Sequence, residues 1–169
     1  SYCSFKHECW GDDLRTFIYA NGPRYLVKVE NLPNVIEVDK DGNNMFDDGS
    51  AAGTPLLRQA IAGCLDMMAD SMLLFAPNLN SYRRFRRGTH APMAPTWGYE
   101  NRTVAVRVPA DSPAATRLEH RVAGADANPY LVMAGILAGM LHGIESKLEA
   151  PAPLEGNAYE QVPANLPRY

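Results

Sequence analysis

An arginine-rich stretch between residues 81 and 121 constrains this chain more than any other feature of its sequence. It holds eight of the twelve arginines and no lysine, and its net charge is +5 although the whole chain carries −3. A guanidinium binds carboxylate or phosphate through two parallel hydrogen bonds, whereas an ammonium offers only a point charge. The stretch therefore favours a site for such anions. Its arginines are Arg83, Arg84, Arg86, Arg87, Arg102, Arg107, Arg117 and Arg121.

The end of this stretch, Thr116–Val122, has the pattern of a strand with charges on one face. Side chains alternate between the two faces of a strand, so Arg117, Glu119 and Arg121 form a row of plus, minus and plus. Such a row can hold an anion beside a cation. The alternative is a solvated, salt-bridged strand, since surface ion pairs are common and weak. The motifs around the row favour the site.

Two long helices are predicted, and both begin in the same way. Thr54–Pro55 and Asn128–Pro129 each place a capping side chain before a proline, whose missing N–H costs nothing in a first turn. The helices are expected over about 54–75 and 129–148. The second helix contains a stripe of glycines, each of which destabilises a helix by about 1 kcal/mol relative to alanine. Such a stripe predicts that the helix packs closely against a sheet or a neighbouring helix. The glycines are Gly135, Gly139 and Gly143.

The strand signals complete an α+β fold in which antiparallel strands pack against two long helices. An antiparallel pair is expected near 102–108 and 116–122. A β-hairpin is predicted around residues 21–23, because runs rich in β-branched and aromatic residues flank Asn-Gly-Pro. The apolar run Tyr130–Leu141 is shorter than the roughly 20 residues that a membrane span needs.

Two short segments are reminiscent of metal sites. Residues 39–50 place Asp and Asn as in a calcium loop, but the closing glutamate and the flanking helix pair are missing, which favours a simple turn. Cys3, His7 and Cys9 have ligand-like spacing, but no fourth ligand is evident, which favours an ordinary surface terminus.

Length and composition narrow the class of protein. The 169 residues suit one ordinary domain, and the pI near 5.8 argues against a nucleic-acid-binding protein. Three cysteines form no disulfide framework, which is typical of a reducing cytoplasm. The first residues lack the apolar core of a signal peptide.

Four motifs occur in one order along the chain: Asn-Ser-Tyr-x-Arg at 80–84, Trp-Gly-x-x-Asn-Arg-x-x-x-x-Arg at 97–107, Arg-x-Glu-x-Arg at 117–121 and Asp-Ala-Asn-Pro-Tyr-Leu at 126–131. Together they resemble the C-terminal part of the catalytic domain of glutamine synthetases and related γ-glutamyl-amine ligases. The resemblance implies three parts: an unmatched lead at 1–38 with the β-hairpin, the glutamine synthetase-like portion at 39–158, and an irregular tail at 159–169.

The resemblance also implies an activity. In such enzymes ATP phosphorylates the γ-carboxylate of glutamate, and an amine then displaces the phosphate, with Mg²⁺ or Mn²⁺ as cofactor. By position, Arg84 and Arg121 match contacts to glutamate. Arg102, Arg107 and Arg117 match contacts to ATP, with Arg102 at the phosphoryl-transfer centre. The other arginines of the stretch have no match and are expected to be solvated.

Two further residues carry implied roles. Glu119 matches a metal ligand. His90 stands in Gly88-Thr89-His90-Ala91-Pro92, where glutamine synthetases carry a glutamate that takes a proton from ammonium. A neutral imidazole would instead serve as a base for a bulkier amine. The alternative is that His90 is only a loop residue, and the sequence leaves both open. The surrounding motifs favour a polyamine or monoamine over ammonia.

Several family elements have no counterpart before residue 39, namely the His-x-His motif, further metal ligands and the β-grasp domain that completes a neighbouring subunit's site. We therefore expect an incomplete chain, inactive by itself, from a cytoplasmic homo-oligomeric ligase that binds neither nucleic acid nor membrane. The alternative is a catalytically inactive regulatory or structural relative. A nucleic-acid module reading phosphates through residues 83–87 would call for lysines and a basic pI.

Overall fold

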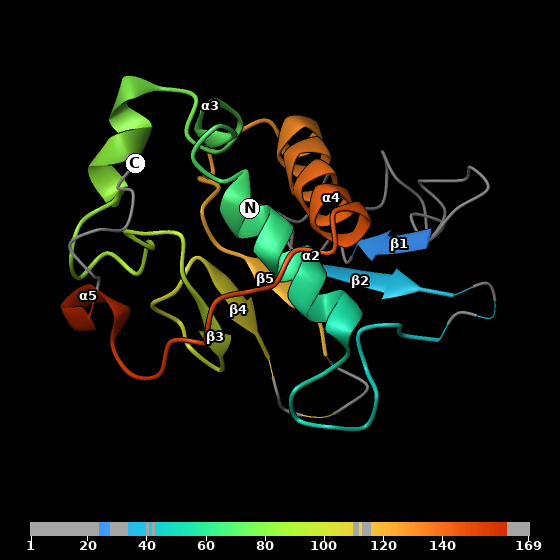
Figure 1. Cartoon of the computed structure of the whole chain (residues 1–169). Helices are drawn as coiled ribbons and strands as arrows, with labels where there is room; N and C mark the ends of the chain where they lie inside the picture. The colour runs from blue at the N-terminus through green and yellow to red at the C-terminus, as the bar shows by residue number, and fades with distance from the viewer. Residues whose placement is uncertain are drawn as a thin grey trace.

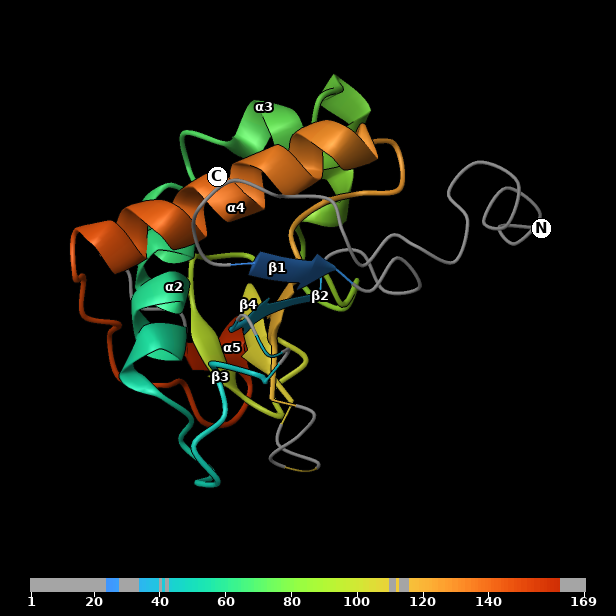
Figure 2. The same cartoon turned by 90° about the vertical axis from the view of Figure 1, so that its right-hand side faces the viewer.

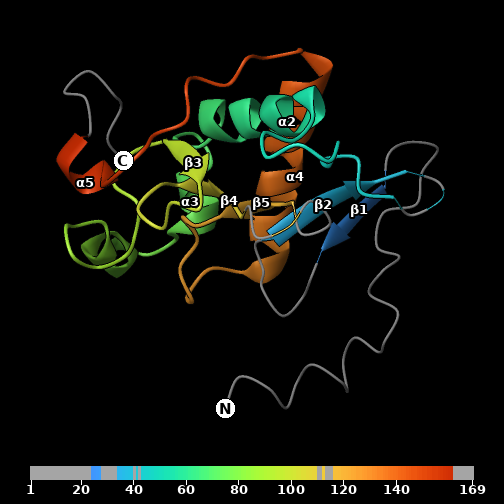
Figure 3. The ribbon, with the colours of Figure 1, turned by 90° about the horizontal axis from the view of Figure 1, so that it is seen from below.

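The computed structural model describes residues 24–27, 34–39, 41, 43–109, 112 and 116–161. Its centre is a five-stranded sheet with the order β1-β2-β5-β4-β3, which Figure 3 shows edge to edge, with the short helix α5 (Ala158–Gln161) beyond β3. The strands are β1 (Arg24–Val27), β2 (Asn34–Val38), β3 (Trp97–Tyr99), β4 (Val106–Val108) and β5 (Leu118–His120).

The predicted antiparallel pairing is confirmed between β4 and β5, where Arg107 lies opposite Glu119. The strand expected over 102–108 begins only at Val106, because residues 102–105 form turns and bends. The remaining edge differs from the expected antiparallel arrangement, because β3 pairs with β4 in parallel. Parallel neighbours usually need a crossover of a dozen or more residues. Here the connection between β3 and β4 is short, because each strand has only three residues. The carbonyl of Thr96, just before β3, accepts hydrogen bonds from the amides of Ala105 and Val106 at the start of β4.

The other end of the sheet joins the N-terminal part of the chain to the arginine strands. β1 pairs antiparallel with β2, and β2 pairs antiparallel with β5, where Asn34 lies opposite Glu119. Residues 14–20, the predicted partner of β1 in a hairpin, lie outside the described residues, as do Cys3, His7 and Cys9.

The helix predicted over 54–75 is not continuous. It divides into α2 (Pro55–Asp66) and α3 (Met72–Phe75), separated by a turn at 67–71. Asp and Ser side chains compete with the helical backbone and therefore disfavour a helix interior, and Asp66, Asp70 and Ser71 flank or occupy this turn. The turn also lets Met68 and Phe75 both reach the core, where each is almost completely buried. The mostly apolar composition of residues 54–75 predicted one continuous helix and gave no sign of the break between α2 and α3.

The second predicted helix is confirmed as α4 (Pro129–Glu145), and it packs on α2 through its glycines. A Cβ atom at Gly63 would lie 2.6 Å from the Cα of Gly143, and one at Gly143 would lie 2.8 Å from the Cα of Gly63. The backbones therefore touch, as the glycine stripe predicted. α4 ends slightly before 148, because Lys147 adopts a left-handed conformation with φ of 50°.

The predicted caps of both helices are present. The Thr54 hydroxyl accepts a hydrogen bond from the amide of Leu57 (3.3 Å), and Oδ1 of Asn128 accepts from the amide of Tyr130 (3.0 Å). In the described part of the loop at 39–50, Oδ1 of Asp39 accepts a hydrogen bond from the backbone amide of Asn43 at 2.9 Å, a contact typical of the turn that the sequence favoured.

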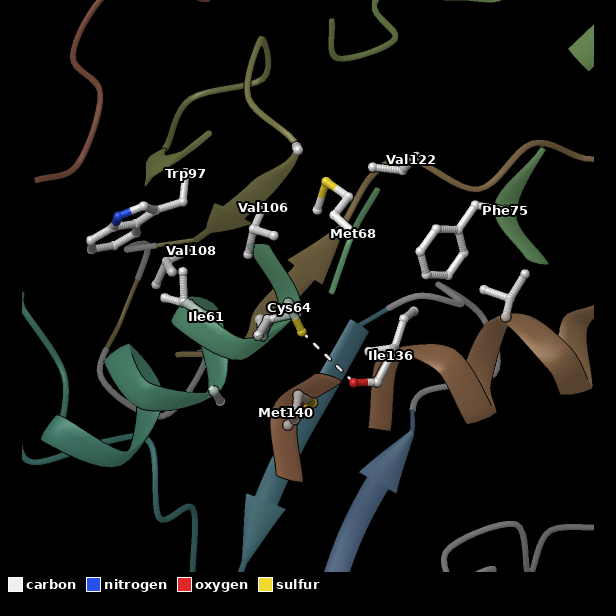
Figure 4. Close-up of a cluster of buried hydrophobic side chains, with 14 of the residues drawn as sticks. Ile61, Cys64, Met68, Phe75, Trp97, Val106, Val108, Val122, Ile136 and Met140 are labelled. Carbon is white, nitrogen blue, oxygen red and sulfur yellow. Dashed lines mark hydrogen bonds between the residues drawn. The ribbon is translucent and has the colours of Figure 1, made fainter. Parts of the chain in front are cut away.

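The helices cover one face of the sheet (Figures 1 and 2). Figure 4 shows Ile61 and Cys64 of α2 facing Val106 of β4, with Ile136 of α4 beside them. The Cys64 thiol lies 3.7 Å from the carbonyl of Ile136, and burial raises its pKa to about 12. None of the helices in the described part of the chain has both the length and the hydrophobicity needed to span a membrane.

Candidate active site

The charged face of the sheet is the one turned away from the core. In β5, Leu118 and His120 are buried while Glu119 between them is partly exposed, and β4 repeats the pattern around Arg107. Arg121 is also partly exposed. Strand alternation thus separates the charges from the apolar side chains, as the sequence predicted.

An alternating row of charges crosses this face. Arg107 places Nη1 at 3.1 Å from Oε2 of Glu119 and Nη2 at 2.6 Å from Oε2 of Glu100. The other carboxylate oxygen of Glu119 lies 3.2 Å from Nε of Arg121. The order Glu100, Arg107, Glu119, Arg121 therefore joins three strands or strand ends by direct ion pairs.

Glu100 is the member of this row that sequence reasoning missed. It directly follows β3 and has a φ of 48°, a left-handed conformation that is uncommon for a residue with a side chain. Its amide donates to the carbonyl of Val108 at 3.0 Å, which fixes that conformation. Only the parallel pairing of β3 and β4 brings it to Arg107, and no sequence signal predicted that pairing.

Burial adjusts the electrostatics of the row. Desolvation by itself would lower the pKa of Arg107, but the hydrogen bond and charge of Glu100, together with Glu119, raise it above its ordinary value. Desolvation lowers the pKa of Arg121, and the charge of Glu119 opposes that effect. Both guanidinium groups stay charged at neutral pH, because the ordinary value for arginine is far above 7.

Arg121 joins the strand to two loops. Its Nη1 donates to the carbonyl of Arg102, and its Nη2 lies 3.5 Å from the carbonyl of His90. We call residues 86–92 the His90 loop and residues 100–105 the Arg102 loop. All three nitrogens of Arg121 thus have protein acceptors, and the residues predicted for catalysis, His90 and Arg102, are attached through their backbones to the residue predicted for glutamate.

Arg84 lies at the C-terminal end of the 3₁₀ helix η3 (Leu79–Arg84) and reaches the chain just after Arg121. Its Nη1 donates to the carbonyl of Val122 at 2.7 Å, and its Nη2 to that of Ala123 at 3.4 Å. Desolvation lowers the pKa of Arg84, and the charge of Asp126 opposes that effect. Arg84 is therefore anchored beside the end of β5 through the backbone of residues 122 and 123, and its convergence on the charged row stays a prediction.

Three further predicted site residues, His90, Arg102 and Arg117, differ in their exposure to solvent. His90 and Arg102 are exposed, whereas Arg117 is partly buried. His90 has a φ of 59°, and its loop is fixed by Thr89, whose hydroxyl donates to the carbonyl of Arg86 at 2.7 Å. The imidazole is exposed to solvent, which is compatible with both interpretations of His90.

A divalent cation is not accommodated by the described residues alone. Magnesium takes about six oxygen ligands, and both oxygens of Glu119 already face guanidinium groups. Among the described residues there is no group of three or more His, Cys, Asp or Glu side chains suited to a metal ion. Glu119 therefore supplies at most one ligand, and the role of a metal ligand stays a prediction.

The comparisons with known proteins identify the family and agree with the fold. Residues 36–168 match the catalytic domain of glutamine synthetase. The chain belongs to this family.

The similar curated proteins include several ligases of organic amines. A γ-glutamylputrescine synthetase of Escherichia coli is 51% identical over 120 residues, which cover 71% of this chain and 25% of that protein. A γ-glutamylethanolamide synthetase of Streptomyces coelicolor is 44% identical over 129 residues, which cover 76% of this chain and 28% of that protein. The chain thus spans about a quarter of the length of these relatives. The expected likeness to polyamine and monoamine ligases is confirmed.

A solved structure shows the same fold. The complex of GmaS with ADP superposes with a TM-score of 0.70 at 30% sequence identity, over 80% of this chain and 32% of that one. The coarse prediction of a glutamine synthetase-like α+β fold is therefore correct, with the corrections given above for α2, α3 and β3.

Proposed function

We propose that the protein is an ATP-dependent ligase that joins the γ-carboxyl group of glutamate to an organic amine through γ-glutamyl phosphate. Transfer of the γ-phosphoryl group to the carboxylate oxygen gives ADP and an acyl phosphate. The amine nitrogen then attacks the acyl carbon, loses a proton and expels phosphate. Both steps bring anionic groups together, and preorganised guanidinium groups stabilise that charge.

The observation that carries this proposal is the row Glu100–Arg107–Glu119–Arg121 on one face of the sheet. The two carboxylates hold the two guanidinium groups in fixed places, so little reorganisation is needed when a substrate anion arrives. Relatives named for putrescine and ethanolamine support an organic amine as the acceptor.

The proposed roles follow the sequence prediction. Arg107, Arg102 and Arg117 contact the phosphates of ATP, and Arg102 also acts at the phosphoryl-transfer centre. Arg84 and Arg121 hold glutamate through N–H groups that the backbone carbonyls leave unused, since a guanidinium has five. In the same proposal Glu119 is a ligand of Mg²⁺ or Mn²⁺ once ligands outside the described residues join it, and His90 accepts the proton of the amine.

The test is release of phosphate by the protein at its natural full length, with ATP, glutamate and one of ammonium, putrescine or a monoamine. We expect turnover with an organic amine to exceed that with ammonium. Arg107→Gln should lower it about 100-fold, as loss of one preorganised donor does, whereas Arg87→Gln, an exposed arginine of the same stretch, should not. An ATP-binding protein that releases no phosphate with any amine would instead be an inactive relative.

The chain of 169 residues, tested by itself, is proposed to bind nucleotide weakly and to release no phosphate. Its described residues supply arginines but only one metal-ligand candidate, and catalysis needs charge stabilisation and positioning together. Turnover by this chain would contradict that part of the proposal. Oligomerisation, which the family resemblance implies, is tested by measuring the mass of the full-length protein in solution.

A further inference from the structure

The His90 loop and the Arg102 loop are attached on two sides. On one side Arg121 donates to the backbone carbonyls of His90 and Arg102. On the other side the chain returns from a distant part of the sequence, at residues 154–161. Because these loops carry the two predicted catalytic residues, the second set of attachments bears on the same site.

Those attachments are specific hydrogen bonds from helix α5 and the residues before it. The amide of Ala158 donates to the hydroxyl of Thr103 at 2.9 Å, and the hydroxyl of Tyr159 donates to the carbonyl of Ala91 at 2.9 Å. Asn101 completes the contact, since its side-chain amide donates to the carbonyls of Leu154 at 3.0 Å and Gly156 at 2.8 Å.

Tyr159 is well placed to hold the His90 loop. Ala91, the acceptor residue, is 3% exposed, and Tyr159 is partly buried next to the buried Ala158. Burial raises the pKa of Tyr159, and the nearby charge of Arg121 opposes that shift. The hydroxyl therefore stays protonated at neutral pH and able to donate. The residue next to its acceptor is His90, whose backbone already occupies a left-handed conformation.

We propose that Tyr159 is a positioning residue for the amine step: its hydroxyl fixes the backbone of the His90 loop and so sets where the imidazole meets the amine. This inference rests on the proposed function and assigns a specific task to a part of the chain that the sequence suggested was only an irregular tail. Tyr159 touches no reacting atom in this role, and it acts through Ala91 and His90.

The experiment compares Tyr159→Phe with Tyr99→Phe in the protein at its natural full length. Tyr99 is a matched control, because its hydroxyl also donates to a backbone carbonyl at 2.8 Å, but to that of Ala52, which belongs to neither loop. Amide hydrogen exchange of residues 86–92 is measured in both variants. We expect exchange to rise about three- to tenfold in Tyr159→Phe, the effect of one lost hydrogen bond, and to stay unchanged in Tyr99→Phe.

The kinetic arm measures kcat/KM for putrescine or a monoamine, and KM for ATP. Tyr159→Phe should lower kcat/KM for the amine about three- to tenfold with KM for ATP unchanged, because the hydroxyl of Tyr159 is bonded to the His90 loop and to none of the residues proposed to contact ATP. Thr103→Val, which frees α5 at its other attachment, should reproduce the faster exchange of residues 86–92, and Thr103→Ser should restore it.

Unchanged exchange in Tyr159→Phe would overturn the inference, whatever the kinetics show. Faster exchange with an unchanged kcat/KM for the amine would overturn the role in the amine step. Equal loss of kcat/KM for the amine and of ATP affinity would indicate general loosening and would also overturn it. If the unsubstituted protein shows no amine-dependent turnover, the proposed function is wrong, and so is the role of Tyr159 in the amine step. Hydrogen exchange still decides, independently of turnover, whether Tyr159 holds the His90 loop.

Discussion

Arg107 and Glu119 lie directly opposite each other on β4 and β5, and their side chains form an ion pair of 3.1 Å on the face of the sheet away from the core. Arg107 also binds Glu100 at the shorter distance of 2.6 Å, but the side chain of Glu100 is 43% exposed whereas that of Glu119 is 19% exposed. Solvent screens exposed pairs. We therefore expect Glu119 to be the stronger partner despite the longer distance.

A double-mutant cycle measures this ranking. Arg107→Gln should lower the free energy of unfolding by about 1–2 kcal/mol, because it leaves the partly buried Glu119 with one partner fewer. The coupling between Arg107→Gln and Glu119→Gln should exceed that between Arg107→Gln and Glu100→Gln, as measured by urea unfolding. The opposite order would show that distance outweighs burial here.

The contact of α2 with α4 should tolerate no added atom. Gly63→Ala is expected to lower the free energy of unfolding by about 2–3 kcal/mol, since its Cβ would meet backbone atoms of Gly139 and Gly143 that cannot yield without separating the helices. Ala138→Ser, on the exposed side of α4, should change it by less than about 0.5 kcal/mol. Thermal unfolding of both variants checks the difference.

The imidazole of His120 should make stability fall in acid. It is 1% exposed, and its ring centroid lies 4.6 Å from that of Phe75. Burial lowers its pKa to about 3 from 6.5. The unfolded chain therefore binds a proton below about pH 6.5 that the folded protein refuses, so stability is complete above that pH and declines as the pH falls towards 3.

The expected slope from His120 is at most about 1.4 kcal/mol per pH unit. His120→Leu should remove this component from the difference in unfolding free energy between pH 7 and pH 4, measured in urea at each pH. His142→Gln, which removes an exposed histidine paired with an exposed Asp66, serves as the control. An unchanged slope in His120→Leu would mean that the carboxylates alone cause the decline.

Substitution of His90 should change the choice of amine. His90→Glu would place a carboxylate where a small cation is attracted, and we expect the ratio of kcat/KM for an organic amine to that for ammonium to fall about tenfold. Phosphate release with each amine gives the ratio, and His90→Gln separates the loss of the base from the gain of the charge. If both variants keep the ratio of the unsubstituted protein, His90 is only a loop residue.

Features that depend on neighbours a few residues apart could be predicted from the sequence. The alternation of Arg117, Glu119 and Arg121 with apolar residues placed the charges on one face, since side chains in a strand repeat every two residues. The capping residues before α2 and α4 and the glycine stripe of α4 were equally readable, because helix ends and helix faces follow local spacing. The ordered motifs identified the family.

Contacts between residues far apart in the chain became visible only in the folded structure. The break between α2 and α3 depends on which side chains the core accepts, and the apolar composition of 54–75 was compatible with either outcome. The parallel pairing of β3 brought Glu100 to Arg107, and the return of residues 154–161 brought Tyr159 to Ala91, 68 positions away. Such contacts arise from packing of whole elements, and no local periodicity encodes them.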